Sequence, residues 1–85
     1  MQVTHEVEVF AYEAGEEVVA GLSGVEALDV ERCAPVPAAC MPPWTIGRVV
    51  AWVRRAGRPA YVLRFRRHGA VCLCVVDEDA IEGVA

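Results

Sequence analysis

The sequence predicts a small, mainly β domain, and two features of its second half carry this prediction. Three short apolar segments, at residues 46–55, 60–65 and 70–76, follow one another along the chain. Turn-forming residues separate them at positions 56–59 and 66–69. Short strands at regular spacing, joined by tight turns, are typical of a small barrel or sandwich. The chain has 85 residues, which is enough for one domain.

The first half of the chain predicts two further strands and a helix. Residues 3–12 alternate apolar and polar side chains, which indicates a strand with one solvated face. The apolar residues 18–20 are expected to form another short strand. Ser23 is followed three positions later by Glu26, the pattern of a capping box. We therefore expect one short helix from residue 24 to about residue 32.

Two segments between and after these elements are expected to be irregular. Residues 33–43 contain four prolines, which prevent a regular hydrogen-bond ladder, so we expect an apolar loop packed over the rest of the domain. The acidic residues 77–81 are expected to form a single 3₁₀ turn.

The apolar content predicts self-association. Apolar residues make up 55% of the chain, which is more than one core of this size can bury. A subunit interface is the expected place for the surplus. We therefore expect a homo-oligomer, a dimer or a tetramer.

Charge is strongly segregated along the chain. Residues 1–31 carry eight carboxylates, residues 32–67 carry all eight arginines, and residues 68–85 carry four carboxylates. The acidic ends are expected to lie beside the basic middle, in the same chain or across a subunit boundary. The alternative is an arginine surface for an acidic protein or an anionic ligand, because guanidinium groups bind carboxylate and phosphate in bidentate fashion.

The candidate surface combines the arginines of the predicted hairpins with two nearby aromatic residues. Its members are Arg54, Arg55, Arg58, Arg64, Arg66, Arg67, Trp52 and Phe65. Nucleic acid stays open as a partner, because aromatic rings and guanidinium groups stack on bases. The net charge of −4 opposes general affinity for a polyanion.

The four cysteines are expected to be apolar packing residues. Cys72 and Cys74 lie two residues apart on a predicted strand, so both point to one side. We expect this segment, Val71, Cys72, Leu73 and Cys74, to line the seam between subunits. The alternatives are a zinc site made by Cys33, Cys40, Cys72 and Cys74, or a disulfide.

No catalytic motif is present, and the sequence predicts a cytoplasmic protein. The chain shows no serine–histidine–aspartate order, no phosphate-binding glycine loop and no histidine-rich metal motif. Its first residues lack a basic start followed by an apolar run, so no export is expected. The longest uncharged stretch, residues 33–47, holds four prolines and does not predict a membrane helix.

The order of these motifs resembles that of the SH3-like barrels. The segments GRVVAW at 47–52, AYVLRF at 60–65 and EDAI at 78–81 follow the family pattern, in which a 3₁₀ turn precedes the last strand. The segment GEEV at 15–18 resembles the start of the first barrel strand. The resemblance implies a single domain over residues 1–85. Residues 1–14 would add an N-terminal strand to a barrel over 15–85 that has an enlarged loop at 33–43 and one short helix. An α+β fold is the alternative.

Within this superfamily the chain is most similar to the type II dihydrofolate reductases carried on plasmids and integrons. That family forms tetramers around one pore, and its residues occur in comparable order at Trp44, Gly47, residues 49–52, Tyr61, Val71 and Glu82. The family's pore strand reads Val-Gln-Ile-Tyr, whereas residues 71–74 read VCLC, and the chain has no lysine. The resemblance therefore implies architecture and self-association but not catalysis.

These observations predict a non-catalytic binding or assembly module that self-associates and presents an arginine-rich hairpin surface, with no cofactor. One alternative is an NADPH-dependent enzyme of the type II reductase kind with an altered pore. The other is a nucleic-acid-binding accessory protein.

Overall fold

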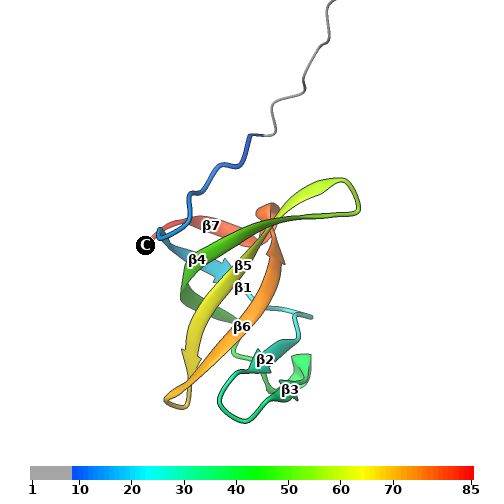
Figure 1. The fold of residues 1–85 in the computed structure, drawn as a ribbon, viewed down its shortest axis with the longest axis vertical. Helices are drawn as coiled ribbons and strands as arrows, with labels where there is room; N and C mark the ends of the chain where they lie inside the picture. The colour runs from blue at the N-terminus through cyan, green and yellow to red at the C-terminus, as the bar shows by residue number, and fades with distance from the viewer. Residues whose placement is uncertain (1–8) are drawn as a thin grey trace, which may run out of the picture.

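The computed structural model describes residues 9–85 and confirms a mainly β fold (Figure 1). Its strands are β1 (Glu17–Gly21), β2 (Ala27–Asp29), β3 (Ala34–Val36), β4 (Trp44–Arg55), β5 (Arg58–Arg67), β6 (Ala70–Asp77) and β7 (Ile81–Val84). Two 3₁₀ turns, η1 (Ala38–Cys40) and η2 (Glu78–Ala80), complete the described elements, and η2 confirms the predicted acidic turn. The strand expected at residues 3–12 falls mostly outside the described residues, and residues 9–12 are not in a strand.

The seven described strands form one antiparallel sheet in the order β3-β2-β6-β5-β4-β1-β7. The long strands β4, β5 and β6 form its curved centre, and β2 and β3 lie at one end (Figure 1). The hairpin of β4 and β5 extends beyond the other strands, with its turn at Ala56 and Gly57. The sheet curls around its inner face, as in a small barrel. Neither described 3₁₀ helix is long and apolar enough to cross a membrane.

The curvature of β4 has two local causes. Its register with β5 shifts between Val49 and Ala51, which marks a β-bulge. At Gly47 an added Cβ would lie 3.3 Å from the backbone oxygen of Arg64. Glycine therefore allows β4 and β5 to approach closely where the sheet bends.

Alternate residues of the central strands fill the core. Val49, Tyr61, Leu63, Cys72 and Val76 are fully buried on the inner face. Phe65 is also buried. Trp44 and Trp52 lie outside this core and are half-exposed.

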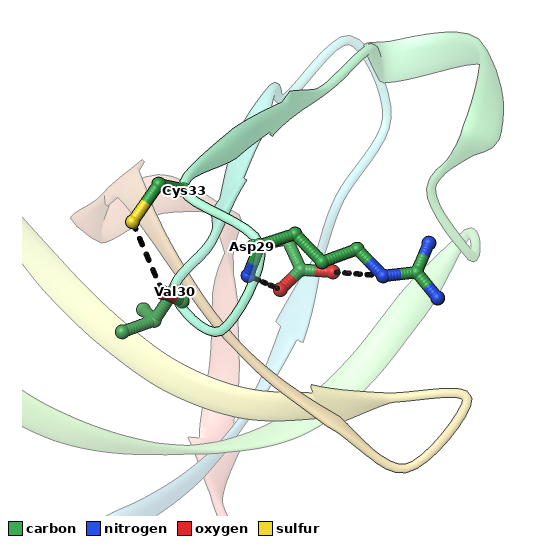
Figure 2. Close-up of polar contacts among 4 residues, drawn as sticks. Asp29, Val30 and Cys33 are labelled. Atoms are coloured by element: carbon green, nitrogen blue, oxygen red, sulfur yellow. Dashed lines mark hydrogen bonds and ion pairs between the residues drawn. The ribbon is translucent and has the colours of Figure 1, made fainter.

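The expected helix at 24–32 is absent, and β2 with a tight turn takes its place. The carboxylate of Asp29 accepts a hydrogen bond from the backbone N–H of Arg32 at 3.1 Å (Figure 2). Such a local bond from an aspartate closes a turn instead of continuing a helix. Asp29 is the one polar side chain of the described residues that is buried.

The proline-rich segment 33–43 is more regular than expected. Its residues Ala34–Val36 form β3, which pairs with β2 at the edge of the sheet. Pro35 lies opposite Leu28, and proline is tolerated here because an edge strand has no neighbour on its second side. The expectation of an irregular loop was therefore wrong for this part of the segment.

Candidate functional site

The predicted arginine surface is divided into three groups by the sheet. Arg54, Arg55 and Arg58 lie at the tip of the β4–β5 hairpin. Arg64 and Arg66 lie on the outer face of β5, with exposed side chains. The side chain of Arg67 instead donates from Nε to the backbone oxygen of Cys40 at 3.1 Å.

The two aromatic members of the predicted surface have different environments. Phe65 is only 3% exposed and belongs to the core, so its ring is not available to a ligand. Trp52 stacks on Phe10 with the ring centroids 5.5 Å apart. Its Nε1 donates to the backbone oxygen of Tyr12 at 2.8 Å. Trp52 is nevertheless 50% exposed.

Charge pairing at the hairpin tip follows the sequence expectation in part. Arg55 donates from Nε and Nη2 to Oδ1 of Asp77, at 3.2 and 2.9 Å. Glu78, the next acidic residue along the chain, does not pair with an arginine within the described residues; its Oε1 accepts from the hydroxyl of Tyr61 and the backbone N–H of Ala11. The tip is therefore partly neutralised by the acidic turn that follows β6.

A pocket on the outer face of the sheet gathers three arginines, one of which the sequence analysis missed. In the register of β4 and β5, Arg48 lies directly opposite Arg64. Arg66 lies two residues further along β5, on the same face. The pocket measures about 330 Å³ and is lined by Glu17, Ile46, Gly47, Arg48, Arg64, Phe65 and Arg66.

The β-bulge creates this juxtaposition. At the tip of the hairpin Arg55 lies opposite Arg58, and this register, if continued, would set Arg48 opposite the inward Phe65. The shift between Val49 and Ala51 moves the partner of Arg48 to Arg64. No turn residue or strand pattern signals the bulge, so the sequence alone did not indicate Arg48.

The three guanidinium groups of the pocket are held differently. Arg48 donates to Oε1 of Glu17 at 2.8 Å and to the backbone oxygen of Gly15 at 2.9 Å. Arg66 donates to the backbone oxygen of Gly69 at 3.2 Å. Within residues 9–85, the side chain of Arg64 makes no hydrogen bond or ion pair.

An apolar surface adjoins the pocket over β2, β5 and β6. We call it the outer apolar face, and it consists of Leu28, Val30, Val62, Val71, Leu73 and Val75. Leu28 pairs with Leu73, and Val62 pairs with Val75. Leu28 and Val30 are 45% and 40% exposed, and a hollow of about 370 Å³ lies beside Leu28, Leu73 and Val75.

The predicted seam segment is split between the two faces of β6. Cys72 and Cys74 do point to one side, but that side is the core, where they are 0% and 4% exposed. Val71 and Leu73 lie on the outer apolar face. Only these two members of the segment can therefore be reached by another chain.

The structure separates the four cysteines into an exposed pair and a buried pair. Cys33 and Cys40 are exposed, whereas Cys72 and Cys74 are buried, and all four are free thiols. Across residues 9–85 no group of three or more metal-ligating side chains comes together. Burial raises the pKa of Cys74 from 9.0 to about 12, and burial next to Asp29 raises the pKa of Cys72. The buried thiols are therefore protonated and serve as packing groups.

Comparisons with known proteins add no relative. No protein-family model, no curated protein and no solved structure matches the chain.

Proposed function

We propose that the protein is a non-catalytic assembly module, which associates with copies of itself through the outer apolar face and presents arginines beside it. The observation that carries this proposal is the exposure of Leu28 and Val30 over a sheet whose inner face already has a complete core. The half-buried Val71 and Leu73 continue the same surface.

The apolar character of this face favours burial against another surface. Burying apolar surface contributes roughly 25 cal/mol for each Å² removed from water. The face spans three adjacent strands, so its side chains form one continuous patch instead of scattered exposed residues. Continuous exposed apolar patches are typical of protein interaction sites.

Charges at the two sides of the face favour a second copy as the occupant. Arg64 lies opposite Leu73, on the β5 side of the face. Glu26, just before β2, is exposed and lines the hollow on the other side. A two-fold interface places each residue against a different residue of the partner, and the reverse contact follows by symmetry. A face with arginine on one side and glutamate on the other is therefore complementary to itself.

Sedimentation velocity of the wild-type protein and of two variants tests this proposal. Leu28→Glu places a charge in the centre of the face at a half-exposed position, so the monomer should still fold. Val9→Glu makes the same change at a valine that is 78% exposed and outside the face. We expect oligomers for the wild type and Val9→Glu, and monomers for Leu28→Glu. Thermal melting of each variant shows whether it is folded.

Two results would contradict the proposal. A wild-type protein that sediments as a monomer at a concentration of about 100 µM would exclude an interface of standard size with useful affinity. Oligomers that persist unchanged in Leu28→Glu and in Leu73→Glu would place the interface elsewhere on the molecule.

A further inference from the structure

We infer that the pocket over β1, β4 and β5 is a binding site for a phosphate monoester, held by Arg48, Arg64 and Arg66. This site borders the outer apolar face and shares Arg64 with its edge, and ligand binding does not require self-association. The inference depends on the convergence of the three arginines, their charge balance and the apolar side chain beside them.

The convergence of charge is unusual for a sheet surface. Arg48 and Arg64 lie directly opposite each other on neighbouring strands, an arrangement that destabilises a sheet when both residues carry the same charge. Arg66, two residues further along the same face of β5, also lines the pocket. An anion between them would remove the repulsion.

The formal charge of the pocket matches a phosphate monoester. Three guanidinium groups and the carboxylate of Glu17 sum to +3 − 1 = +2. A phosphate monoester carries about −1.5 to −2 charges at pH 7 and offers three acceptor oxygens. A monoanionic carboxylate would leave the pocket with excess positive charge, so phosphate is the better match.

The arginines differ in their readiness to bind. Glu17 and the backbone oxygen of Gly15 fix the guanidinium group of Arg48 at one wall of the pocket. The guanidinium group of Arg64 has no hydrogen bond or ion pair within the described part of the chain, so its donors are available for bidentate contact. We assign the main phosphate contact to Arg64, with Arg48 and Arg66 completing the charge.

The size and lining of the pocket favour an ester over free phosphate. Its volume of about 330 Å³ falls in the range of small-molecule sites. Ile46 lines the pocket and is 50% exposed, so it offers an apolar surface to the organic group of an ester. An inorganic phosphate would use the arginines but not Ile46.

NMR titration of the ¹⁵N-labelled full chain with phenyl phosphate tests the inference. We expect saturable shifts at residues 46–48 and 64–66, and weaker binding of inorganic phosphate. Arg64→Gln should raise the Kd by about tenfold or more, because a charged hydrogen-bond donor is lost. Arg58→Gln is the matched control at the hairpin tip and should change the Kd by less than about twofold. If Arg64→Gln fails to fold, Arg64→Lys replaces it, and we expect a smaller but measurable loss because the bidentate contact is lost.

Two further titrations identify the source of the phosphate and separate phosphate binding from self-association. A phosphoserine peptide that binds more tightly than phenyl phosphate would indicate a phosphorylated protein as ligand, and weaker binding would indicate a free ester. The Leu28→Glu variant should bind phenyl phosphate at least as tightly as the wild type, because loss of the interface leaves Arg64 free for the ligand; weaker binding would contradict the inference, whether or not the wild type forms oligomers.

Three outcomes would overturn the inference. One is the absence of saturable shifts at millimolar phenyl phosphate. Another is an equal loss of affinity in Arg58→Gln and Arg64→Gln, which would indicate a diffuse basic surface. The third is a single-stranded oligonucleotide that binds through the hairpin tip while phenyl phosphate does not bind in the pocket.

Discussion

Tyr61 is the residue that joins the segment before β1 to the sheet. Its ring is fully buried and meets the rings of Phe10 and Tyr12 edge to face, at centroid distances of 5.8 and 5.6 Å. Its hydroxyl donates to Oε1 of Glu78 at 2.5 Å and accepts from the backbone N–H of Tyr12 at 3.3 Å. Burial and the bond to Glu78 raise the pKa of Tyr61, so the hydroxyl stays protonated.

Replacing Tyr61 by phenylalanine tests the value of this hydroxyl. We expect Tyr61→Phe to lower the free energy of unfolding by about 1.5–3 kcal/mol, since a hydrogen bond to a charged group is lost in the interior. Urea denaturation measures the change. Tyr12→Phe is the matched control, because the Tyr12 hydroxyl makes no hydrogen bond within residues 9–85, and it should change stability by less than about 0.5 kcal/mol. Equal losses in the two variants would show that the bond to Glu78 contributes nothing.

Cys74 should make stability fall at high pH. Its pKa is raised from 9.0 to about 12 in the folded chain, so the unfolded chain loses the thiol proton first. The stability that depends on the protonated thiol is therefore complete below about pH 9 and decreases as the pH rises towards 12. At pH 11 the loss should be on the order of 2–3 kcal/mol.

Denaturation at pH 8 and pH 11 measures this loss in the wild type, in Cys74→Ala and in Cys40→Ala. We expect Cys74→Ala to be less stable at pH 8, because a buried side chain is shortened, but to lose less stability between the two pH values. Cys40 is exposed, so Cys40→Ala should keep the wild-type dependence. An unchanged pH dependence in Cys74→Ala would contradict the account of the buried thiol.

The cysteines also show what a sequence can determine at the level of single residues. The two-residue spacing of Cys72 and Cys74 was sufficient to place both side chains on one face of β6, as the structure confirms. Spacing does not say which face is the core, because β6 is apolar on both sides. Which face of β6 becomes the core depends on how β6 pairs with β2 and β5, and the sequence alone does not reveal this pairing.

The segment 9–12 acts as a strap that packs on the β4–β5 hairpin at the pair of Trp52 and Tyr61. Phe10 stacks on Trp52, and the indole N–H of Trp52 donates to the backbone oxygen of Tyr12. These contacts were not apparent from the sequence, because the alternation of residues 3–12 indicated a strand. In the described part of this segment, side-chain contacts with the hairpin replace strand pairing.

Phe10→Ala should loosen this strap without unfolding the sheet. We expect the free energy of unfolding to fall by about 0.5–1.5 kcal/mol for the lost ring pairs, and further for the lost apolar burial. The emission of Trp52 should also shift to the red. The measurement uses a Trp44→Phe background, so that Trp52 is the only indole. Val9→Ala is the control, because Val9 is largely exposed. Emission that is the same in Phe10→Ala and Val9→Ala would show that the stack on Trp52 does not persist in solution.

Two elements illustrate why the sequence prediction failed where it did. The pattern of Ser23 and Glu26 favoured a helix, but Leu28 pairs with Leu73 and Pro35, and these tertiary pairings produce β2 instead. The bulge near Val50 moved Arg48 opposite Arg64, and a local shift of register of this kind has no fixed sequence pattern. The strands and turns of residues 44–77 were predicted well because their alternation and turn residues are local signals.

At the scale of the whole molecule, the fold decides where the apolar surplus and the segregated charges lie. The mainly β class followed from strand spacing and is confirmed, since all seven described strands belong to one antiparallel sheet. The surplus of apolar residues predicted an interface, and the outer apolar face is the surface that we propose for it. Composition could not indicate this location, because the face combines residues of β2, β5 and β6, which are distant in sequence.

A native mass spectrum of the purified wild-type protein, recorded beside its denatured mass, measures self-association and bound mass in one experiment. We expect a dimer or a larger closed assembly of the 9.2 kDa chain, with no added mass, and dissociation to monomers in Leu28→Glu. A monomer at every concentration, or a monomer that carries one zinc ion per chain, would contradict this expectation.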